Sequence, residues 1–186
     1  SGKTTLLRLI SGVLRPSRGR IQIGEADLAT LGSRERARLI SVVPQDPRLP
    51  LSFVARDLVL MGRNPHLRLL QSEGYRDLGI VIRAMEATET DHLIERRLDT
   101  LSVGERQRVV IAMALAQEAP IMLLDEPTSS LDLAHQTMIM DMVRNIQKKR
   151  DSVVLVAMHD LTLAAQYCSR IVILAEGKSY AEGPPR

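Results

Sequence analysis

Residues 121–127, IMLLDEP, decide the fold of this chain of 186 residues. An apolar run that ends abruptly in acids and a proline is typical of a strand buried on both faces of a parallel sheet. Two more such runs follow, SVVLVAMH at 152–159 and RIVILAE at 170–176. Between the first two, residues 133–149 place apolar side chains on one helical face. The order strand, helix, strand, helix, strand predicts a doubly wound α/β core with mostly parallel strands.

The first residues of the chain carry a phosphate-binding pattern. Gly2-Lys3-Thr4 has the sequence that ends a phosphate-binding loop, and residues 4–13 have helical periodicity directly after it. A helix that starts there points its free N–H groups toward an anion. The tripeptide alone is a weak signal, so its meaning depends on the rest of the chain.

The segments between these two regions divide the chain into a core and an insertion. Residues 20–24 predict a short antiparallel strand, and residues 39–45 predict another short strand. From residue 53 to residue 116 the readable patterns are helical, without a continuous β-branched run. We therefore expect a helical insertion within the α/β core.

Polar side chains at the ends of the predicted strands form the candidate site. In an open α/β sheet, ligands bind at the carboxyl ends of the strands. Asp125 is placed there to hold Mg²⁺, and Glu126 to orient and polarise an attacking water. Gln45 and His159 follow two other predicted strands, so we expect them at the same edge.

Each of these features also has an ordinary structural explanation. An isolated Asp-Glu pair can end a strand at a solvated turn, and a lone glutamine or histidine can be a loop residue. Ser102 with Glu105 three residues on has the pattern of a capping box, and Asp132 is placed to cap a helix. The presence of all these features in this order favours a nucleotide site.

Together, these motifs resemble those of the nucleotide-binding subunits of ABC transporters over essentially the whole chain. The matching stretches are Gly2-Lys3-Thr4-Thr5 (end of the Walker A loop), Gln45 (Q-loop), LSVGE at 101–105 (signature), IMLLDE at 121–126 (Walker B), SSLD at 129–132 (D-loop) and His159 (switch histidine). The resemblance implies a P-loop NTPase (RecA-like) core with a mostly parallel sheet and an inserted α-helical subdomain.

The resemblance also implies a role for each matching residue, with ATP and Mg²⁺ as cofactors. The expected catalytic residues are Glu126, His159, Gln45 and Lys3. The expected nucleotide-binding residues are Ser1, Gly2, Lys3, Thr4, Thr5, Ser102, Val103, Gly104, Glu105 and Asp132. The expected metal ligands are Thr4, Gln45 and Asp125. In this family one ATP is shared between two copies, so we expect a dimer, with a homodimer as the simplest form.

Two departures from the family pattern concern the signature and the ends of the chain. Val103 stands where the family usually has glycine, which reduces the backbone freedom at that position. The first glycines of the Walker A loop, the aromatic that stacks on adenine and a final helical segment are missing from the sequence. We therefore expect an internal fragment of a single ABC ATPase domain, 1–186. Within it we expect a core at 1–45 and 116–186 and a helical subdomain at 46–115.

A finer resemblance points to the cargo. GRNPH at 62–66 is similar to a stretch in ATPases that serve ferric-siderophore, haem and cobalamin importers, although Arg63 and His66 could equally form a solvated helix cap. The implied function is ATP hydrolysis that powers import of such a metal chelate, at the cytoplasmic face of the bacterial inner membrane. The implied partners are transmembrane permease subunits and, indirectly, a substrate-binding protein.

Spacing and composition weigh against other functions. A soluble ABC ATPase acting on DNA or ribosomes is the main alternative, but the stretch between Gln45 and Ser102 lacks the long heptad repeats of DNA-repair members. Glu126 and His159 argue against a non-hydrolysing regulatory module. The net charge of +3 and the aromatic content of 2% give no support for nucleic-acid binding. The single cysteine, Cys168, rules out a disulfide framework and favours a reducing compartment.

Overall fold

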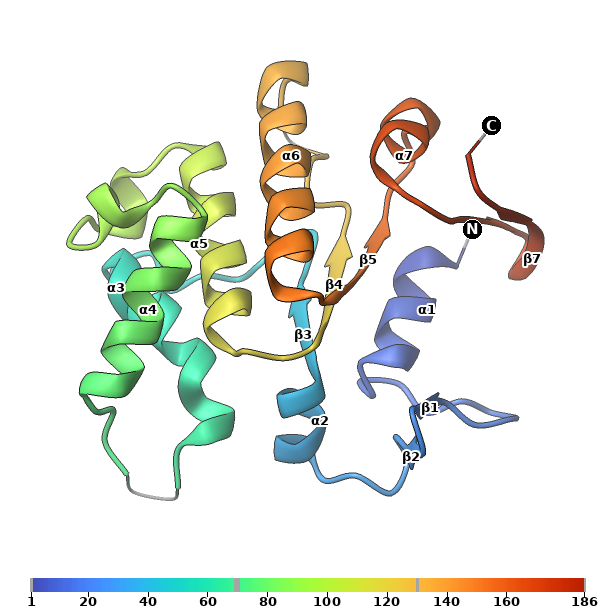
Figure 1. Ribbon diagram of the computed structural model, residues 1–186, viewed down its shortest axis with the longest axis horizontal. Helices are drawn as coiled ribbons and strands as arrows, with labels where there is room; N and C mark the ends of the chain where they lie inside the picture. Colours follow the sequence, from blue (N-terminus) through green and yellow to red (C-terminus); the bar gives the residue numbers. More distant parts are fainter. Residues whose placement is uncertain (1, 69–70, 130, 186) are drawn as a thin grey trace.

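A three-stranded parallel sheet forms the centre of the computed structural model, which describes residues 2–68, 71–129 and 131–185. The sheet has the order β3-β4-β5, formed by β3 (Ile40–Val43), β4 (Ile121–Asp125) and β5 (Val153–Ala157). Both strand pairs are parallel, so the carboxyl ends of all three strands lie at one edge (Figure 1). Three of the predicted strands are thus confirmed as neighbours in a parallel sheet.

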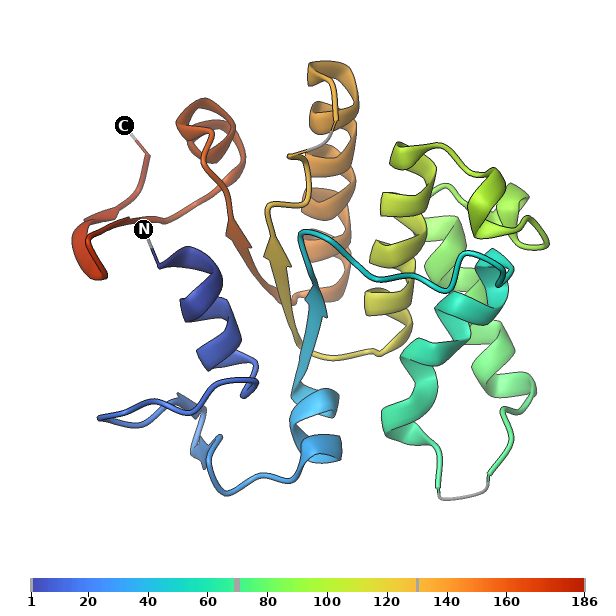
Figure 2. The ribbon, with the colours of Figure 1, turned by 180° about the vertical axis from the view of Figure 1, so that it is seen from behind.

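Helices cover both faces of this sheet. α1 (Lys3–Ile10) lies on one face, where Leu7 packs with Leu123 of β4. α5 (Val103–Ala116) and α6 (Leu133–Arg150) lie on the other face, where Met122 and Leu124 join the larger core cluster. Because successive side chains of a strand point to opposite faces, β4 is buried on both sides. The predicted doubly wound arrangement is confirmed (Figure 1 and Figure 2).

Further helices connect the strands or pack beside α5. They are α2 (Ser33–Leu39), α3 (Ala55–Leu60), α4 (Tyr75–Ala87) and α7 (Leu161–Tyr167), with the 3₁₀ segments η1 (Met61–His66), η2 (Asp91–Leu93) and η3 (Leu98–Thr100). α3 and α4 pack against α5 through buried apolar side chains such as Leu58 and Val81. The helical character predicted between 53 and 116 is confirmed. In the part of the chain that the structure describes, no helix has the length and apolar character of a membrane span.

The strand predicted at 170–176 does not join the parallel sheet, and this part of the prediction is wrong. β6 (Ile171–Ala175) instead pairs in the antiparallel sense with β7 (Lys178–Gly183), beside the end of the chain (Figure 2). The pairing of β6 with β7 has a local cause. Glu176 and Gly177, which connect the two strands, both have positive φ, at 49° and 74°. A two-residue turn with that geometry favours a tight hairpin. β6 is therefore more exposed than a central strand.

At 20–24, the predicted antiparallel strand is confirmed as β1 (Gln22–Ile23), which pairs with β2 (Ala26–Asp27).

The side chain of Arg63 is buried, so the alternative of a solvated helix cap at 62–66 is wrong. Only 3% of Arg63 is exposed, and its guanidinium lies within ion-pair distance of Asp77 and Glu118. The backbone of η1 approaches α5 closely at Gly62, where an added Cβ would lie 2.2 Å from the carbonyl oxygen of Met113. The absence of a side chain at residue 62 is therefore what allows η1 to lie against α5.

We predict that Gly62→Ala destabilises the protein by about 1–3 kcal/mol, because the new methyl group would force η1 away from α5. The matched control is Gly79→Ala within α4, where an added Cβ would meet no atom closer than 3.5 Å. That change should be neutral or stabilising by about 0.5–1 kcal/mol, since alanine favours helix over glycine. Free energies of unfolding from urea titrations measure both. A Gly62→Ala protein as stable as Gly79→Ala would contradict the packing argument.

Candidate functional site

The carboxyl edge of the sheet brings together side chains from four separate segments. Asp125 is the last residue of β4 and Glu126 follows it, while Gln45 lies two residues beyond β3 and His159 two beyond β5. The N-terminus of α1, with Lys3, reaches the same edge (Figure 1). The parallel direction of the strands is the reason that residues so far apart in sequence lie together.

Glu126 is the centre of this group. Its Oε2 accepts a hydrogen bond from Gln45 Nε2 at 3.1 Å, and its Oε1 lies 3.7 Å from Lys3 Nζ. The Nδ1 atom of His159 lies 3.5 Å from Glu126 Oε2. The four residues predicted to be catalytic are therefore in mutual contact through one carboxylate.

The backbone at Glu126 adopts a conformation that is uncommon for a residue with a side chain. Its φ is 47°, in the left-handed region, which costs about 1 kcal/mol or more relative to a relaxed backbone. Two hydrogen bonds hold it there: Glu126 N donates to Ala157 O at 2.8 Å, and Ser129 N donates to Glu126 O at 3.2 Å. This bend ends β4, and the chain turns away from the sheet at the residue that bears the carboxylate.

The N-terminus of α1 lines a hollow suited to an anion and a cation together. Gly2, with φ of 95°, precedes the helix and has no side chain with which to cap it. The hollow has a volume of about 250 Å³ and is lined by Gly2, Lys3, Thr4, Thr5 and Glu126. Free N–H groups and a lysine ammonium are the groups that bind phosphate. Ser1, also predicted to bind nucleotide, lies outside the described residues.

Oxygen atoms next to the hollow are suited to a hard cation. Thr4 Oγ1 donates to Asp125 Oδ1 at 3.2 Å, and Asp125 is only 7% exposed. The described residues contain no group of three or more His, Cys, Asp or Glu that could hold a metal by themselves. A divalent ion at Thr4 and Asp125 would therefore take its other oxygens from bound phosphate, from water and from a neutral side chain such as Gln45, which is the usual manner of Mg²⁺.

The signature stretch begins α5 in a reciprocal capping arrangement. Ser102 Oγ accepts from Glu105 N at 3.2 Å, and Ser102 N donates to Glu105 Oε2 at 2.7 Å, so the predicted capping box is confirmed. The Ser102 N–H, and then the Ser102 side chain, lower the pKa of the Glu105 carboxyl. Val103 is the first helical residue and is half exposed. Its backbone is right-handed helical, so glycine's freedom is not needed here.

The signature and the Glu126 group border a common groove. The groove has a volume of about 350 Å³, and its lining includes Gln45 and Glu126 from the strand ends and Val103 and Arg106 from α5. α5 and α1 lie on opposite sides of the sheet, with their N-termini toward the same edge (Figure 1 and Figure 2). The residues predicted at the strand ends thus contact one carboxylate, while Ser102–Glu105 begin the helix on the other side of the sheet from α1.

Asp132 caps α6, as its spacing predicts, and it has a partner that the sequence did not reveal. Its Oδ1 accepts from the backbone N–H of His135 at 2.9 Å, and the same oxygen lies 2.8 Å from His135 Nδ1. These contacts, the backbone one first, lower the pKa of Asp132. His135 also lies beside Gly104, where an added Cβ would be 3.4 Å from its Cδ2. A histidine three residues after a helix cap is the signal that could have predicted this. Of the SSLD stretch, Ser130 lies outside the described residues.

Comparison with known proteins gives a family match and close relatives. A family model described as ABC transporter matches residues 1–129. The chain is 42% identical over 186 residues to the cobalamin import ATP-binding protein BtuD of Halobacterium salinarum, covering all of this chain and 46% of that protein. It is 46% identical over 192 residues to the hemin import ATP-binding protein HmuV of Gloeobacter violaceus, covering 100% of this chain and 69% of that one. The chain spans about half the length of the first of these relatives.

Solved structures share the fold. A metal-chelate type ABC transporter in an inward-facing conformation superposes with a TM-score of 0.87 at 29% identity, covering 99% of this chain and 68% of that chain. A dimeric ATP-binding cassette, MJ0796, bound to ADP and Pi superposes with a TM-score of 0.86 at 27% identity, covering 100% of this chain and 81% of that one. Both likenesses extend over the sheet, the helices and the candidate site.

We predict that Ser102→Ala destabilises the protein by about 1 kcal/mol, because the N–H of Glu105 loses its capping acceptor. Ser102→Thr is the matched control, since threonine also accepts a hydrogen bond at this position and should retain most of the stability. Thermal and urea unfolding of both variants would measure the difference. Equal loss in the two variants would mean that the hydroxyl of Ser102 does not act as a cap.

Proposed function

Because this chain belongs to the ABC transporter family, we propose that it is an ATP-binding and ATP-hydrolysing subunit that powers import through a membrane permease. The observation that carries the proposal is the contact of Lys3, Gln45 and His159 with the single carboxylate of Glu126. Such a group at strand ends, beside a helix N-terminus, is suited to phosphoryl transfer to water. The cargo we propose is a metal chelate of the iron-siderophore, haem or cobalamin type, in line with the printed names of the relatives.

The phosphates of ATP would occupy the hollow at the start of α1. The first N–H groups of the helix and the positive end of its dipole favour a bound anion there. Lys3 contacts Glu126 in the structure, but a triphosphate carries more negative charge than one carboxylate. We therefore expect Lys3 to turn to the phosphates when ATP binds, with Gly2, Thr4 and Thr5 contributing backbone or hydroxyl groups.

The residues beside the hollow fit Mg²⁺. Thr4 Oγ1 and Asp125 Oδ1 lie 3.2 Å apart, so two oxygen ligands are already neighbours. The side-chain oxygen of Gln45 is the third ligand that we propose. When bound, the ion neutralises charge on the phosphate oxygens of the transferred group. Asp125 is buried and fixed by Thr4, so its carboxylate is held toward the hollow without reorganisation.

Glu126 is the residue we propose to orient the attacking water and accept its proton. Once Lys3 contacts the phosphates, this carboxylate is free to accept a hydrogen bond from water. Gln45, which donates to Glu126 at 3.1 Å, keeps the carboxylate in place. His159 is exposed and lies near the same carboxylate oxygen as Gln45, and it would contact the γ-phosphate and help hold the water.

A second copy would complete the site. The signature begins α5, across the sheet from the α1 hollow that would hold the phosphates (Figure 1). We therefore propose that Ser102, Val103, Gly104 and Glu105, together with Asp132, act on ATP held by a partner copy. A two-fold dimer would then form two equal composite sites. The dimeric form of the MJ0796 cassette supports this arrangement.

The other partners follow from transport. We propose that residues 46–115, the helical subdomain, contact the permease, because this segment directly follows Gln45 and includes the signature and can therefore transmit changes at both. The core would comprise residues 1–45 and 116–186. The subunit would sit peripherally on the cytoplasmic face of the bacterial inner membrane, and it would meet a substrate-binding protein only indirectly.

We predict that Glu126→Gln in the full-length protein retains ATP binding but lowers ATP turnover by about a hundredfold or more, because glutamine cannot accept the proton of water. Phosphate release and nucleotide affinity measure the two effects separately. Glu25→Gln, an exposed acid in the β1–β2 hairpin, is the control and should hydrolyse ATP at the wild-type rate. Phosphate release near the wild-type rate in Glu126→Gln would overturn the assignment of Glu126.

We also predict that the full-length subunit co-purifies with a multi-span permease and that crosslinks fall within residues 46–115. The reason is the position of this helical segment between Gln45 and Ser102. Crosslinking followed by mass spectrometry would map the contact, with residues 133–150 of α6 as the comparison surface. Crosslinks concentrated on α6 would show that the permease is bound elsewhere.

A further inference from the structure

The stretch GRNPH at 62–66 lies at the C-terminal end of α5, remote from the carboxyl edge of the sheet. Three successive carbonyls at this end of the helix each contact a side chain from another segment. Arg150 Nη1 donates to Leu115 O at 2.9 Å, Arg63 Nη1 donates to Ala116 O at 2.7 Å, and His66 Nε2 donates to Gln117 O at 2.7 Å. The last carbonyls of a helix lack partners within it and carry partial negative charge. Two arginines and a histidine therefore hold this end of α5.

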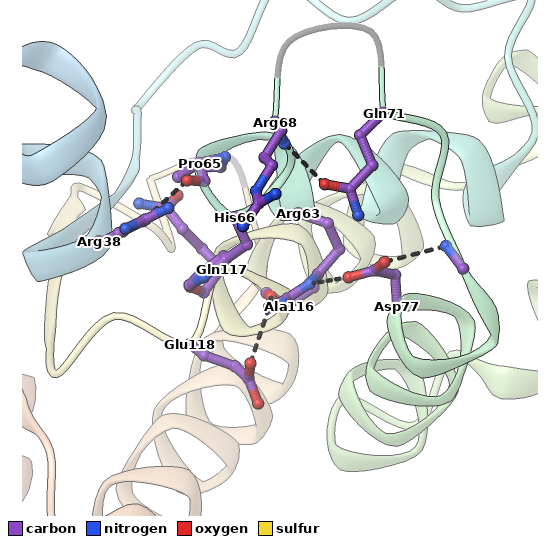
Figure 3. A network of polar contacts seen from close by, with 11 residues as sticks. Arg38, Arg63, Pro65, His66, Arg68, Gln71, Asp77, Ala116, Gln117 and Glu118 are labelled. Carbon is purple, nitrogen blue, oxygen red and sulfur yellow. Dashed lines mark hydrogen bonds and ion pairs between the residues drawn. The ribbon is translucent and has the colours of Figure 1, made fainter.

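Arg63 is the buried centre of this network. Besides Ala116 O, its guanidinium contacts Asp77 Oδ1 at 3.0 Å and Glu118 Oε2 at 2.8 Å (Figure 3). Asp77 in turn accepts from the N–H of Gly74 at 3.1 Å, so it also caps α4. That N–H first, and Arg63 after it, lower the pKa of Asp77. One side chain thus joins the beginning of α4, the end of α5 and the segment that leads to β4.

The same network reaches the core of the protein. Gln117 Nε2 donates to Ile40 O at 2.7 Å and also contacts Ala37 O. Arg38 Nε donates to Pro65 O at 2.9 Å (Figure 3). Ala37 and Arg38 belong to α2, and Ile40 begins β3. The C-terminal end of α5 is therefore fixed to α4, to η1 and to the strand that leads toward Gln45.

α5 has one end in this network and the signature at the other. Its 14 residues make it about 20 Å long. For a rod of that length, a tilt of about 3° at one end moves the other by about 1 Å. A misplacement of about 1 Å at a reacting centre can cost about a hundredfold in rate. Small changes in how Arg63 holds α5 are thus large enough to matter at Ser102.

We propose that Arg63 is a positioning residue for the ATP site of the partner copy, because it fixes the direction of α5 and thereby the placement of Ser102 and Gly104. The inference rests on the proposed function, in which these residues act on ATP bound by the other copy. It makes Arg63 act in trans, across the dimer. If Arg63 instead positions the strand-end residues of its own copy, its loss would impair the ATP site of that copy, and if it only stabilises the fold, its loss would impair both sites.

The test uses Arg63→Lys in full-length protein, as linked dimers in which each half carries chosen changes. Lysine keeps the buried positive charge but cannot reach Asp77, Ala116 O and Glu118 together. In the first dimer, one half carries Lys3→Ala and the other Arg63→Lys. In the second dimer, one half carries both changes and the other half is wild type. A dimer with Lys3→Ala alone sets the reference rate.

The two arrangements give opposite expectations. If Arg63 acts in trans, the first dimer has one composite site without any defect and should match the reference, whereas the second should hydrolyse ATP about tenfold more slowly or worse. If Arg63 acts within its own copy, the second dimer retains the undamaged site and the first loses it. Equal rates of ATP hydrolysis in the two dimers would also overturn the proposal. The same holds if neither dimer hydrolyses ATP.

Three controls separate this result from other causes. Arg56→Lys, in an exposed ion-pair group with Glu95 and Asp57, should behave as wild type in both arrangements. Glu118→Gln removes one ion-pair partner of Arg63 at a half-exposed position. In place of Arg63→Lys, it should give the same difference in rate between the two dimers, but a smaller one. It is the variant to use if Arg63→Lys does not fold. A wild-type linked dimer that fails to hydrolyse ATP would overturn the proposed function itself.

Discussion

Parallel pairing of β3, β4 and β5 is the constraint on which the rest of the structure depends. Because these strands share a direction, the chain turns at the same edge after Val43, Asp125 and Ala157. Gln45, Glu126 and His159 are therefore neighbours although the sequence separates them widely. Burial on both faces keeps β4 in register, so the acids at its end have a fixed position relative to α1. The relative positions of the polar side chains at the site are therefore set by the pairing of the strands rather than by any one residue.

Much of the candidate site could be predicted because each of its residues lies at the end of a recognisable pattern. The apolar runs before Asp125 and His159 give the strands, and the pattern around Ser102 and Glu105 gives the helix start. What the patterns do not contain is the partner of each strand. β6 reads as a buried strand, yet a two-residue turn pairs it with β7. α2 was not predicted, because its SRERARL sequence has no apolar face.

The network around Arg63 could not be predicted for a different reason. Its partners Asp77, Ala116 and Glu118 are 14, 53 and 55 residues away in sequence. No local pattern reports such contacts, and an arginine two residues before a proline has the sequence pattern of an exposed helix end. Burial of a charge is a property of the folded neighbourhood. The two ends of α5 illustrate the contrast: a capping box written in four adjacent residues begins the helix, and cations from distant segments hold its other end.

The left-handed backbone at Glu126 has an evolutionary consequence. A side chain at a φ of 47° is maintained against an intrinsic preference for glycine or asparagine. In the function that we propose, selection for the carboxylate keeps glutamate there. A duplicated copy of the gene released from that selection would gain stability by drifting to one of those residues, with no change in fold. Among paralogues of this protein, the residue at position 126 would thus distinguish members that still hydrolyse ATP from members that have only a structural role.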